Sequence, residues 1–436
     1  MNAPARVTAT PNETAARRPH VVIVGGGFGG LEAAKALARA PVDVTLVDRQ
    51  NHHCFQPLLY QVATAALSPA DIAWPIRGIV GDRPNMTVLM AQVTGVDTKA
   101  RLVQTNATSL PYDFLVLASG ATHSYFGHDE WAPVAPGLKR IEDATDIRRR
   151  VLIAFERAEI AEDPEERERL MTFVLVGGGP TGVEMAGEIA EVARHALPLD
   201  FRRIDPRTAR IVLVEAGPRI LPAFPEHLSA YAERALTGMG IEVRTNTMVT
   251  GCDALGVSLR EGRIEAATIV WAAGVVASPA ARWIGAEADR AGRIRVGPDL
   301  TVPGHPEIFA IGDTASVIQD GRPVPGIAPA AKQMGRYVAS VIARLAKNEP
   351  PPAPFVYRHQ GDLATIGRKA AVVKLGRFEF RGFLGWVFWS LVHIYFLIGT
   401  RNRLSVALAW AWAYVTFQRA ARLITEPGPP DLQGRS

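Results

Sequence analysis

The chain contains little cysteine: Cys54 and Cys252 are its two cysteines among 436 residues. They stand too far apart in the sequence to form a C-x-x-C pair or a metal-binding cluster. The sequence therefore predicts no iron–sulfur centre, no zinc site and no disulfide framework. It also argues against chemistry that needs an internal pair of thiols, and we expect Cys54 to be a small packed residue.

Long hydrophobic runs are absent as well. A membrane-spanning helix needs about 20 consecutive apolar residues, and the two most apolar segments, residues 383–399 and 404–417, are shorter. Residues 1–19 contain no apolar stretch of the kind found in secretory signals. We expect residues 1–18 and 426–436 to be disordered tails.

Positive charge is concentrated near the C-terminus of a chain whose formal net charge is +5. Residues 355–424 contain ten Arg and Lys against two Asp and Glu, which gives +8, and they hold four of the eight tryptophans. This combination favours an anionic membrane surface over nucleic acid. We expect two short helices that lie on a membrane. A buried helical pair at a dimer interface and a hairpin that enters the membrane are the alternatives.

A glycine-rich turn near the N-terminus carries the strongest motif. The segment VVIVGGGFGG runs from apolar strand formers into glycines, and Gly25, Gly27 and Gly30 fit G-x-G-x-x-G before a helix-forming stretch. This pattern is typical of a Rossmann unit, in which the helix N-terminus binds a pyrophosphate. The next apolar strand ends in Asp48, where a carboxylate can accept hydrogen bonds from a ribose 2′-hydroxyl.

The same pattern occurs a second time. In FVLVGGGPTGVE the glycines are Gly177, Gly179 and Gly182, and the following strand ends in Glu215. A carboxylate at this point repels a 2′-phosphate and so favours NADH over NADPH, although Arg219 lies nearby in the sequence. Two such motifs predict an α/β protein with two Rossmann-like dinucleotide-binding domains, followed by an amphipathic helical membrane-association region. They indicate an enzyme that passes electrons between two dinucleotides.

Other segments repeat between the two halves. YDFLVLASG and TIVWAAG both read as buried strands that end in small residues, which would allow a dinucleotide to approach closely. EIFAIGD is a further apolar strand that ends in Gly312 and Asp313. Asp313 could hydrogen-bond a ribityl hydroxyl or cap the next helix. We expect His52 and His53 to be polar loop residues.

These segments together resemble the type II (non-proton-pumping) NADH:quinone oxidoreductases. The resemblance covers residues 19–424 and rests on VVIVGGGFGGLEAAKAL, NHHCFQPLLYQVAT, FVLVGGGPTGVEMAGEIAE, IFAIGD and GTRNRLSVALAW. It implies hydride transfer from NADH to FAD, then two-electron reduction of a membrane quinone, either ubiquinone or menaquinone, without proton pumping. It also implies a homodimeric peripheral protein on the cytoplasmic face of a bacterial membrane, with no nucleic acid partner.

The resemblance also implies particular site residues. FAD would contact Gly25, Gly27, Phe28, Gly29, Gly30, Asp48, Arg49, Ala118, Ser119, Gly120, Gly312 and Asp313. NADH would contact Gly177, Gly179, Pro180, Thr181, Gly182, Glu215, Ala273 and Gly274. The quinone would lie near Gln333, Lys332 and Arg368, and the catalytic residues would be Glu184 and Gln333.

Gln333 and Glu184 are the two expected catalytic residues. The family usually carries two glutamines four residues apart beside the flavin, and here Gln333 matches the second while Pro329 occupies the first position. This difference leaves Gln333 as the better candidate for a quinone contact. Glu184 resembles the family's acid near the nicotinamide, and the alternative is an acid that stabilises the first turn of a helix.

The expected domain organisation is discontinuous. Residues 19–138 and 285–350 would form the FAD-binding domain, residues 139–284 the NADH-binding domain and residues 351–425 the membrane-association region. A disulfide or sulfide oxidoreductase on the same scaffold would need paired cysteines. A soluble electron-carrier reductase would have no use for the basic aromatic region. A flavin redox sensor at the membrane, without turnover, is a further candidate that the sequence leaves open.

Overall fold

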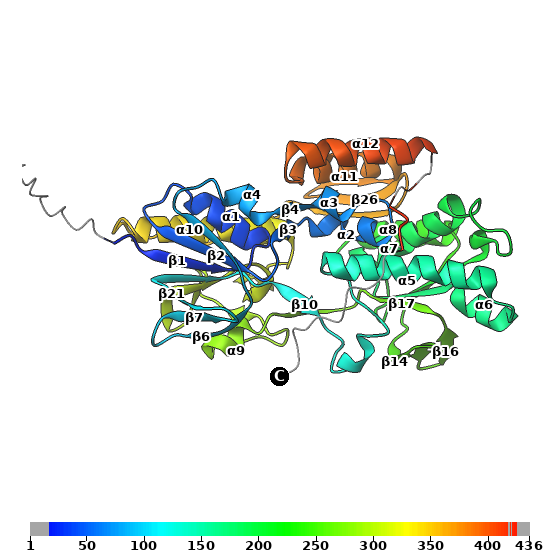
Figure 1. Ribbon diagram of the computed structural model, residues 1–436, viewed down its shortest axis with the longest axis horizontal. Helices are drawn as coiled ribbons and strands as arrows, with labels where there is room; N and C mark the ends of the chain where they lie inside the picture. The colour runs from blue at the N-terminus through cyan, green and yellow to red at the C-terminus, as the bar shows by residue number, and fades with distance from the viewer. Residues whose placement is uncertain (1–16, 417–418, 420, 425–436) are drawn as a thin grey trace, which may run out of the picture.

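The computed structural model describes residues 17–416, 419 and 421–424. The two expected tails lie outside these residues, apart from positions 17 and 18. Figure 1 shows two α/β units side by side, with the C-terminal helices α11 and α12 above the junction between them. This arrangement confirms the predicted fold class.

The first unit is built on a six-stranded sheet in the order β20-β21-β9-β1-β2-β5. Its pairs are parallel except for β20 with β21. The strands are β1 His20–Val24, β2 Asp43–Asp48, β5 Met86–Met90, β9 Phe114–Leu117, β20 Thr301–Val302 and β21 His305–Ala310. The central strand β1 is buried from Val21 to Val24, as expected for a parallel strand covered on both faces.

The second unit repeats the core of the first. Its parallel sheet has the order β13-β12-β11-β17, which matches β5-β2-β1-β9 strand for strand. The strands are β11 Thr172–Val176, β12 Arg210–Val214, β13 Ile241–Arg244 and β17 Thr268–Trp271. Each unit also inserts a three-stranded antiparallel sheet, before β9 in the first unit and before β17 in the second. These sheets are β6 Val93–Asp97, β7 Leu102–Thr105 and β8 Ser109–Pro111, and β14 Val249–Asp253, β15 Gly256–Leu259 and β16 Gly262–Glu265.

Helices cover both sheets. They are α1 Phe28–Leu37 and α10 Ala328–Leu345 in the first unit, and α5 Ile141–Ile160, α6 Pro164–Leu170, α7 Pro180–Glu191 and α8 Glu226–Gly238 around the second. Helices α1 and α10 pack so closely that a Cβ at Gly335 would collide with the carbonyl oxygen of Gly29. Helix α10, which contains Gln333, is therefore a neighbour of the first glycine-rich turn.

Two connections join the units. Strand β10, Ala121–His123, pairs antiparallel with β18, Val275–Ala277. Each strand leaves the carboxyl end of a sheet, β9 in the first unit and β17 in the second. The paired connections therefore hold the carboxyl ends of the two sheets close to each other, where ligands bind in open α/β folds.

The C-terminal region is more than a helical tail. A three-stranded antiparallel sheet, β25 Asp362–Gly367, β26 Ala370–Leu375 and β27 Phe378–Arg381, precedes α11 Gly382–Phe396 and α12 Thr400–Thr416. The sequence did not predict this sheet. Trp389, Leu397 and Val406 are buried in the same core as α5 and α7. Across the described part of the chain, no helix combines the length and the apolar character that crossing a membrane requires.

Candidate functional site

The first glycine-rich turn is shaped by two close approaches, at Gly25 and at Gly30. Gly25 has φ +107°, and a Cβ at this position would collide with the carbonyl oxygen of Ala118. A Cβ at Gly30 would collide with the carbonyl oxygen of Gly25. Gly27 differs, because a Cβ there would meet no atom within 4 Å. The turn therefore needs Gly25 and Gly30 for its own packing, whereas the space over Gly27 is open for a ligand.

Asp48 closes this turn at the end of β2. Its Oδ2 accepts a hydrogen bond from the Gly26 N–H at 2.6 Å, and its Oδ1 accepts one from the Gln50 N–H at 2.7 Å. Each carboxylate oxygen has a further lone pair. Asp48 can therefore hold the turn and still accept a hydroxyl group.

The second turn has the same geometry. Gly177 has φ +112° and would place a Cβ 2.7 Å from the carbonyl carbon of Ala272, and a Cβ at Gly182 would collide with the Gly177 oxygen. Gly179 is open within 4 Å, as Gly27 is. Glu215 accepts hydrogen bonds at 2.6 Å from the N–H groups of residues 178 and 217. The two glycine-rich turns therefore share their close contacts and their carboxylate hydrogen bonds as well as their sequence pattern.

Three predicted FAD contacts meet beside the first turn. The Gly120 N–H donates to Thr314 Oγ1 at 2.8 Å, which joins the end of β9 to the Gly312–Thr314 turn. Ser119 Oγ lies 2.6 Å from Ser278 Oγ. Gly312–Thr314 forms a short 3-10 helix, and Asp313 is its middle residue rather than a cap. The Asp313 carboxylate is therefore available to another partner. Thr314 and Ser278 were not predicted, since neither belongs to a recognisable motif.

His53 is not the polar loop residue that the sequence suggested. It lies in strand β3, His52–Cys54, is 3% exposed, and its Nδ1 lies 2.9 Å from the Gly26 carbonyl oxygen. Its ring meets the Phe28 ring edge-on at 5.0 Å. Burial lowers the pKa of His53 to about 4, so the ring is neutral near neutral pH. The prediction failed because the pairing of β3 with β4, Ala73–Pro75, is a tertiary contact.

Glu184 is the fifth residue of α7, so it does not act on the first turn of that helix. Its side chain is buried, and the N–H of Thr365 in β25 lies 3.5 Å from Oε1. Burial raises the pKa of Glu184 well above the ordinary value, and the charge of Glu188 one turn away raises it further. The structure therefore places a buried carboxyl group, whose ionised form is disfavoured, between α7 and the C-terminal sheet.

Lys332 lies between the first turn and the C-terminal helices. Its Nζ is 5.4 Å from the centroid of the Phe28 ring and 4.8 Å from that of Phe396. Burial lowers the pKa of Lys332. The neighbouring Gln333 exchanges two hydrogen bonds with the Arg358 backbone, at 2.9 and 3.0 Å. The Gln333 amide is therefore tied to the start of the C-terminal region.

Arg368 lies apart from Lys332 and Gln333. Its guanidinium carbon is 4.6 Å from the ring centroid of Tyr414, and that ring stacks on Trp386 near the start of α11. Lys332 instead contacts Phe396 at the end of α11, and ten helical residues between the two span about 15 Å. Arg368 therefore lies near the start of α11 and Lys332 near its end, with Gln333 next to Lys332 in α10.

A charged cluster surrounds Arg368. The buried Arg419 lies 2.6 Å from Glu188 and 3.2 Å from Glu191, measured from Nη2 to the carboxylate oxygens. Glu191 also accepts a hydrogen bond from the Arg368 backbone N–H. Burial and the charge of Glu188 raise the pKa of Glu191 to about 7, against the opposing effect of Arg419. These groups line a small cavity of about 80 Å³ under α11 and α12.

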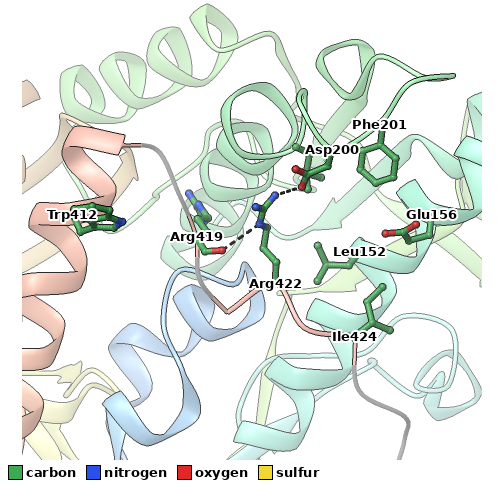
Figure 2. A pocket seen from close by; sticks show the side chains of 9 residues that line it. Leu152, Glu156, Asp200, Phe201, Trp412, Arg419, Arg422 and Ile424 are labelled. Carbon is green, nitrogen blue, oxygen red and sulfur yellow. Dashed lines mark hydrogen bonds and ion pairs between the residues drawn. The ribbon is translucent and has the colours of Figure 1, made fainter.

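A cavity of about 550 Å³ lies on the other side of Arg419. Figure 2 shows Arg422 between Asp200 and the carbonyl oxygen of Arg419, with Trp412 at the edge. None of the predicted site residues lines this cavity. It is therefore separate from the two dinucleotide cradles.

Comparison with known proteins agrees with this geometry. Residues 19–335 match the pyridine nucleotide-disulphide oxidoreductase family, and residues 359–418 match the NDH2 C-terminal domain. The type II NADH:quinone oxidoreductase NdhA of Mycobacterium tuberculosis is 46% identical over 425 residues, which are 94% of this chain and 90% of the relative. The Ndh protein of the same organism is 44% identical over 95% of this chain and 92% of its own.

The chain belongs to the type II NADH:quinone oxidoreductases. The predicted family and enzyme class are confirmed, and with them FAD as cofactor and NADH as substrate. A solved structure of NDH2 from Plasmodium falciparum in complex with NADH superposes with a TM-score of 0.85 at 21% identity, covering 94% of this chain and 100% of that one. At this identity the superposition supports the fold alone.

The described residues contain no group of three His, Cys, Asp or Glu that could hold a metal ion. The two cysteines pack against different cores, Cys54 against the core that contains α5 and α7, and Cys252 against a core of the second unit. Burial raises the pKa of Cys54 to about 12 and that of Cys252 to about 11, which disfavours both thiolates.

Proposed function

We propose that this chain oxidises NADH and reduces a membrane quinone by way of FAD held in the first unit. One observation carries the proposal: two matching cradles, each with an open glycine and a carboxylate at the end of the next strand, face a shared junction. The domain assignment follows, with FAD on residues 19–138 and 285–350 and NADH on residues 139–284.

The first cradle fits FAD. A Cβ at Gly27 or at Gly120 would meet no atom within 4 Å, so both positions border free space at the carboxyl edge of the sheet. The N-terminus of α1 supplies N–H groups for a pyrophosphate, and Asp48 supplies an acceptor for a ribose hydroxyl. When bound, FAD supplies the redox chemistry, accepting two electrons from NADH and passing them to the quinone.

The second cradle would hold NADH through Gly179, the N-terminus of α7 and Glu215. Glu184, further along the same helix, would hold a proton near the nicotinamide end of the site. Burial disfavours the ionised form of this carboxyl group, and a carboxyl group that keeps its proton can donate a hydrogen bond that an ionised carboxylate cannot. We therefore assign Glu184 to proton handling or to positioning of the ring.

The quinone would approach from the C-terminal helices. Lys332 lies between Phe28 of the first turn and Phe396 at the end of α11, and the His393 ring lies 6.2 Å from that of Phe55. Aromatic walls with one cationic group suit a flat ring that carries two carbonyl oxygens. Gln333 and Arg368 are tied to other partners, so Lys332 is the stronger candidate for a quinone contact.

Steady-state assays test this proposal. The purified protein should oxidise NADH in proportion to added short-chain quinone, and Lys332→Met should raise the quinone KM more than the NADH KM. NADH oxidation that ignores quinone but responds to a soluble iron–sulfur carrier would support the soluble reductase instead.

Glu215→Gln is expected to shift nucleotide preference. The change removes a negative charge from the site of the 2′-substituent, so kcat/KM for NADPH relative to NADH should rise about tenfold, or about 1.4 kcal/mol. The Arg219 guanidinium is held by Ser229 Oγ and by two carbonyl oxygens of the following loop rather than by Glu215. The matched control is Glu261→Gln, an exposed charge in the same unit. An unchanged ratio would count against the assignment of Glu215.

We propose that α11 and α12 dock on an anionic membrane surface. Both helices carry apolar side chains on both faces, one face in the core and the other exposed. The exposed set comprises Phe383, Leu384, Leu391, Tyr395, Leu404, Leu408, Trp412 and Val415. Exposed arginines flank it at positions 377, 381, 401 and 403. Apolar side chains for the lipid boundary and cations for its headgroups are what an interfacial helix needs.

Leu391→Ser together with Leu408→Ser should release the protein from membranes. Each leucine loses burial worth about 1.5–3 kcal/mol, so partitioning onto anionic vesicles should fall about tenfold or more per substitution. Leu255→Ser is the control, since Leu255 is 57% exposed and follows β14, a strand that lies on the opposite side of the molecule from α12 in Figure 1. Unchanged sedimentation with vesicles, accompanied by a smaller oligomer, would identify this surface as a subunit interface instead.

Removing the whole region is a poor test of docking, because Trp389 and Val406 belong to the core around α7.

The cytoplasmic face of a bacterial membrane is the proposed location, since NADH is a soluble cytoplasmic metabolite. The homodimer remains a prediction, which sedimentation velocity can test.

A further inference from the structure

The two units differ at one equivalent position. Gly120 and Gly274 stand three residues after the ends of β9 and β17, with φ +72° and +79°. The collisions of Gly25 with Ala118 and of Gly177 with Ala272 fix this correspondence. A Cβ at Gly120 would meet nothing within 4 Å, but one at Gly274 would lie 2.5 Å from Cζ of Phe126. The Phe126 ring therefore covers Gly274 in the second unit, whereas the equivalent Gly120 in the first unit borders open space.

Little holds the Phe126 ring in place. The residue is 68% exposed, and its nearest aromatic neighbour is Trp271, with ring centroids 6.4 Å apart. Its φ is +55°, in the left-handed region that phenylalanine rarely adopts. A large apolar side chain that is exposed, held in a sparsely populated backbone region and placed against Gly274 marks this position for a functional hypothesis.

The backbone beside Phe126 is anchored, in contrast to its ring. The Trp271 Nε1–H donates to the Ser124 carbonyl oxygen at 2.9 Å, and the Ser124 N–H donates to the Gly274 carbonyl oxygen at 3.4 Å. The next residue, Tyr125, is buried against Trp271 with ring centroids 5.2 Å apart. Rotation about the side-chain bonds of Phe126 can therefore move the ring while the segment stays in place.

We propose that Phe126 is a gate on the NADH site. Its ring occupies part of the space that a nicotinamide dinucleotide needs beside Gly274, and it turns outward when the nucleotide enters. This inference rests on the proposed placement of NADH at Gly179 and Glu215. If the ring competes with the nucleotide, the apparent Kd exceeds the intrinsic Kd by the reciprocal of the open fraction.

Phe126→Ala tests the gate, with Phe126→Tyr as the variant that keeps a ring. For Phe126→Ala, the Kd of NAD⁺ measured by calorimetry and the KM for NADH should both fall about two- to tenfold. The quinone KM and the melting temperature should stay at wild-type values. Phe126→Tyr should keep the wild-type Kd. A purely structural role for Phe126 would instead lower the melting temperature and leave the Kd unchanged.

The outcomes separate the gate from the NADH placement. If Gly179→Ala weakens NAD⁺ binding while Phe126→Ala leaves it unchanged or weakens it, the placement stands and the gate is wrong. A higher Kd for NAD⁺ in Phe126→Ala would mean that the ring stacks on the bound nucleotide. If Gly179→Ala leaves NAD⁺ binding unchanged, NADH binds elsewhere and both ideas fail.

Discussion

Gly27→Ala is expected to give a folded protein without flavin, and Gly179→Ala a yellow protein that binds NADH poorly. The added Cβ meets no protein atom within 4 Å at either position, so the fold should tolerate both changes. Each Cβ would instead stand where a pyrophosphate approaches the turn. Losing one or two charge-assisted hydrogen bonds costs about 1.5–3 kcal/mol each, so affinity should fall about tenfold to a hundredfold or more.

Gly30→Ala is the matched control for a structural glycine. Its Cβ would collide with the Gly25 carbonyl oxygen, so this variant should lose both stability and flavin. Flavin content, melting temperature and NADH KM, measured on all three variants, distinguish a lost ligand from a lost fold. If Gly27→Ala retained its flavin while Gly179→Ala became colourless, the assignment of FAD and NADH to the two units would be reversed.

Arg419→Met is expected to destabilise the folded state by about 3–5 kcal/mol, because it removes the cation that pairs with both of the buried carboxyl groups of Glu188 and Glu191. The loss should depend on pH. The folded-state pKa of Glu191 is raised to about 7 from an ordinary value of 4.5. Stability linked to such a group is present at low pH and is lost as the pH rises through the folded pKa. Removing Arg419 raises the pKa further, so the deficit should be larger at pH 8 than at pH 5.

Arg422→Met provides the comparison. Its pair with Asp200 is partly exposed, with 27% and 46% of the two side chains accessible, and such pairs contribute about 0–1 kcal/mol. Urea unfolding of both variants at pH 5 and pH 8 measures the difference. Equal and small losses for the two arginines would show that Arg419 does not neutralise a buried cluster.

The sequence predicted the duplicated part of the fold well, for a physical reason. Buried parallel strands read as continuous apolar runs, and the tight turn between strand and helix requires glycine at fixed spacing. Asp48 and Glu215 follow from the same local geometry, because each ends the strand next to a turn. The apolar strands, the glycine turns and the two carboxylates at the strand ends are all set by residues close together in the chain.

Features set by distant residues were missed. The sheet β25–β27 has short strands in a region whose tryptophans and arginines suggested helices alone. His53 is buried because β3 pairs with β4, and Thr314 meets Gly120 across 194 residues. The contacts of Arg368 with Tyr414 and of Lys332 with Phe396 also join residues far apart in the chain. Phe126 lies in a linker that no motif distinguishes.

The most direct test of the account is an anaerobic titration of the purified protein. One equivalent of NADH per flavin should bleach the visible flavin absorbance, and one equivalent of short-chain quinone should restore it without oxygen. That result would show reducing equivalents entering from NADH and leaving to quinone through one bound flavin. A protein that retains no flavin, or a bleached flavin that quinone cannot restore, would contradict the account.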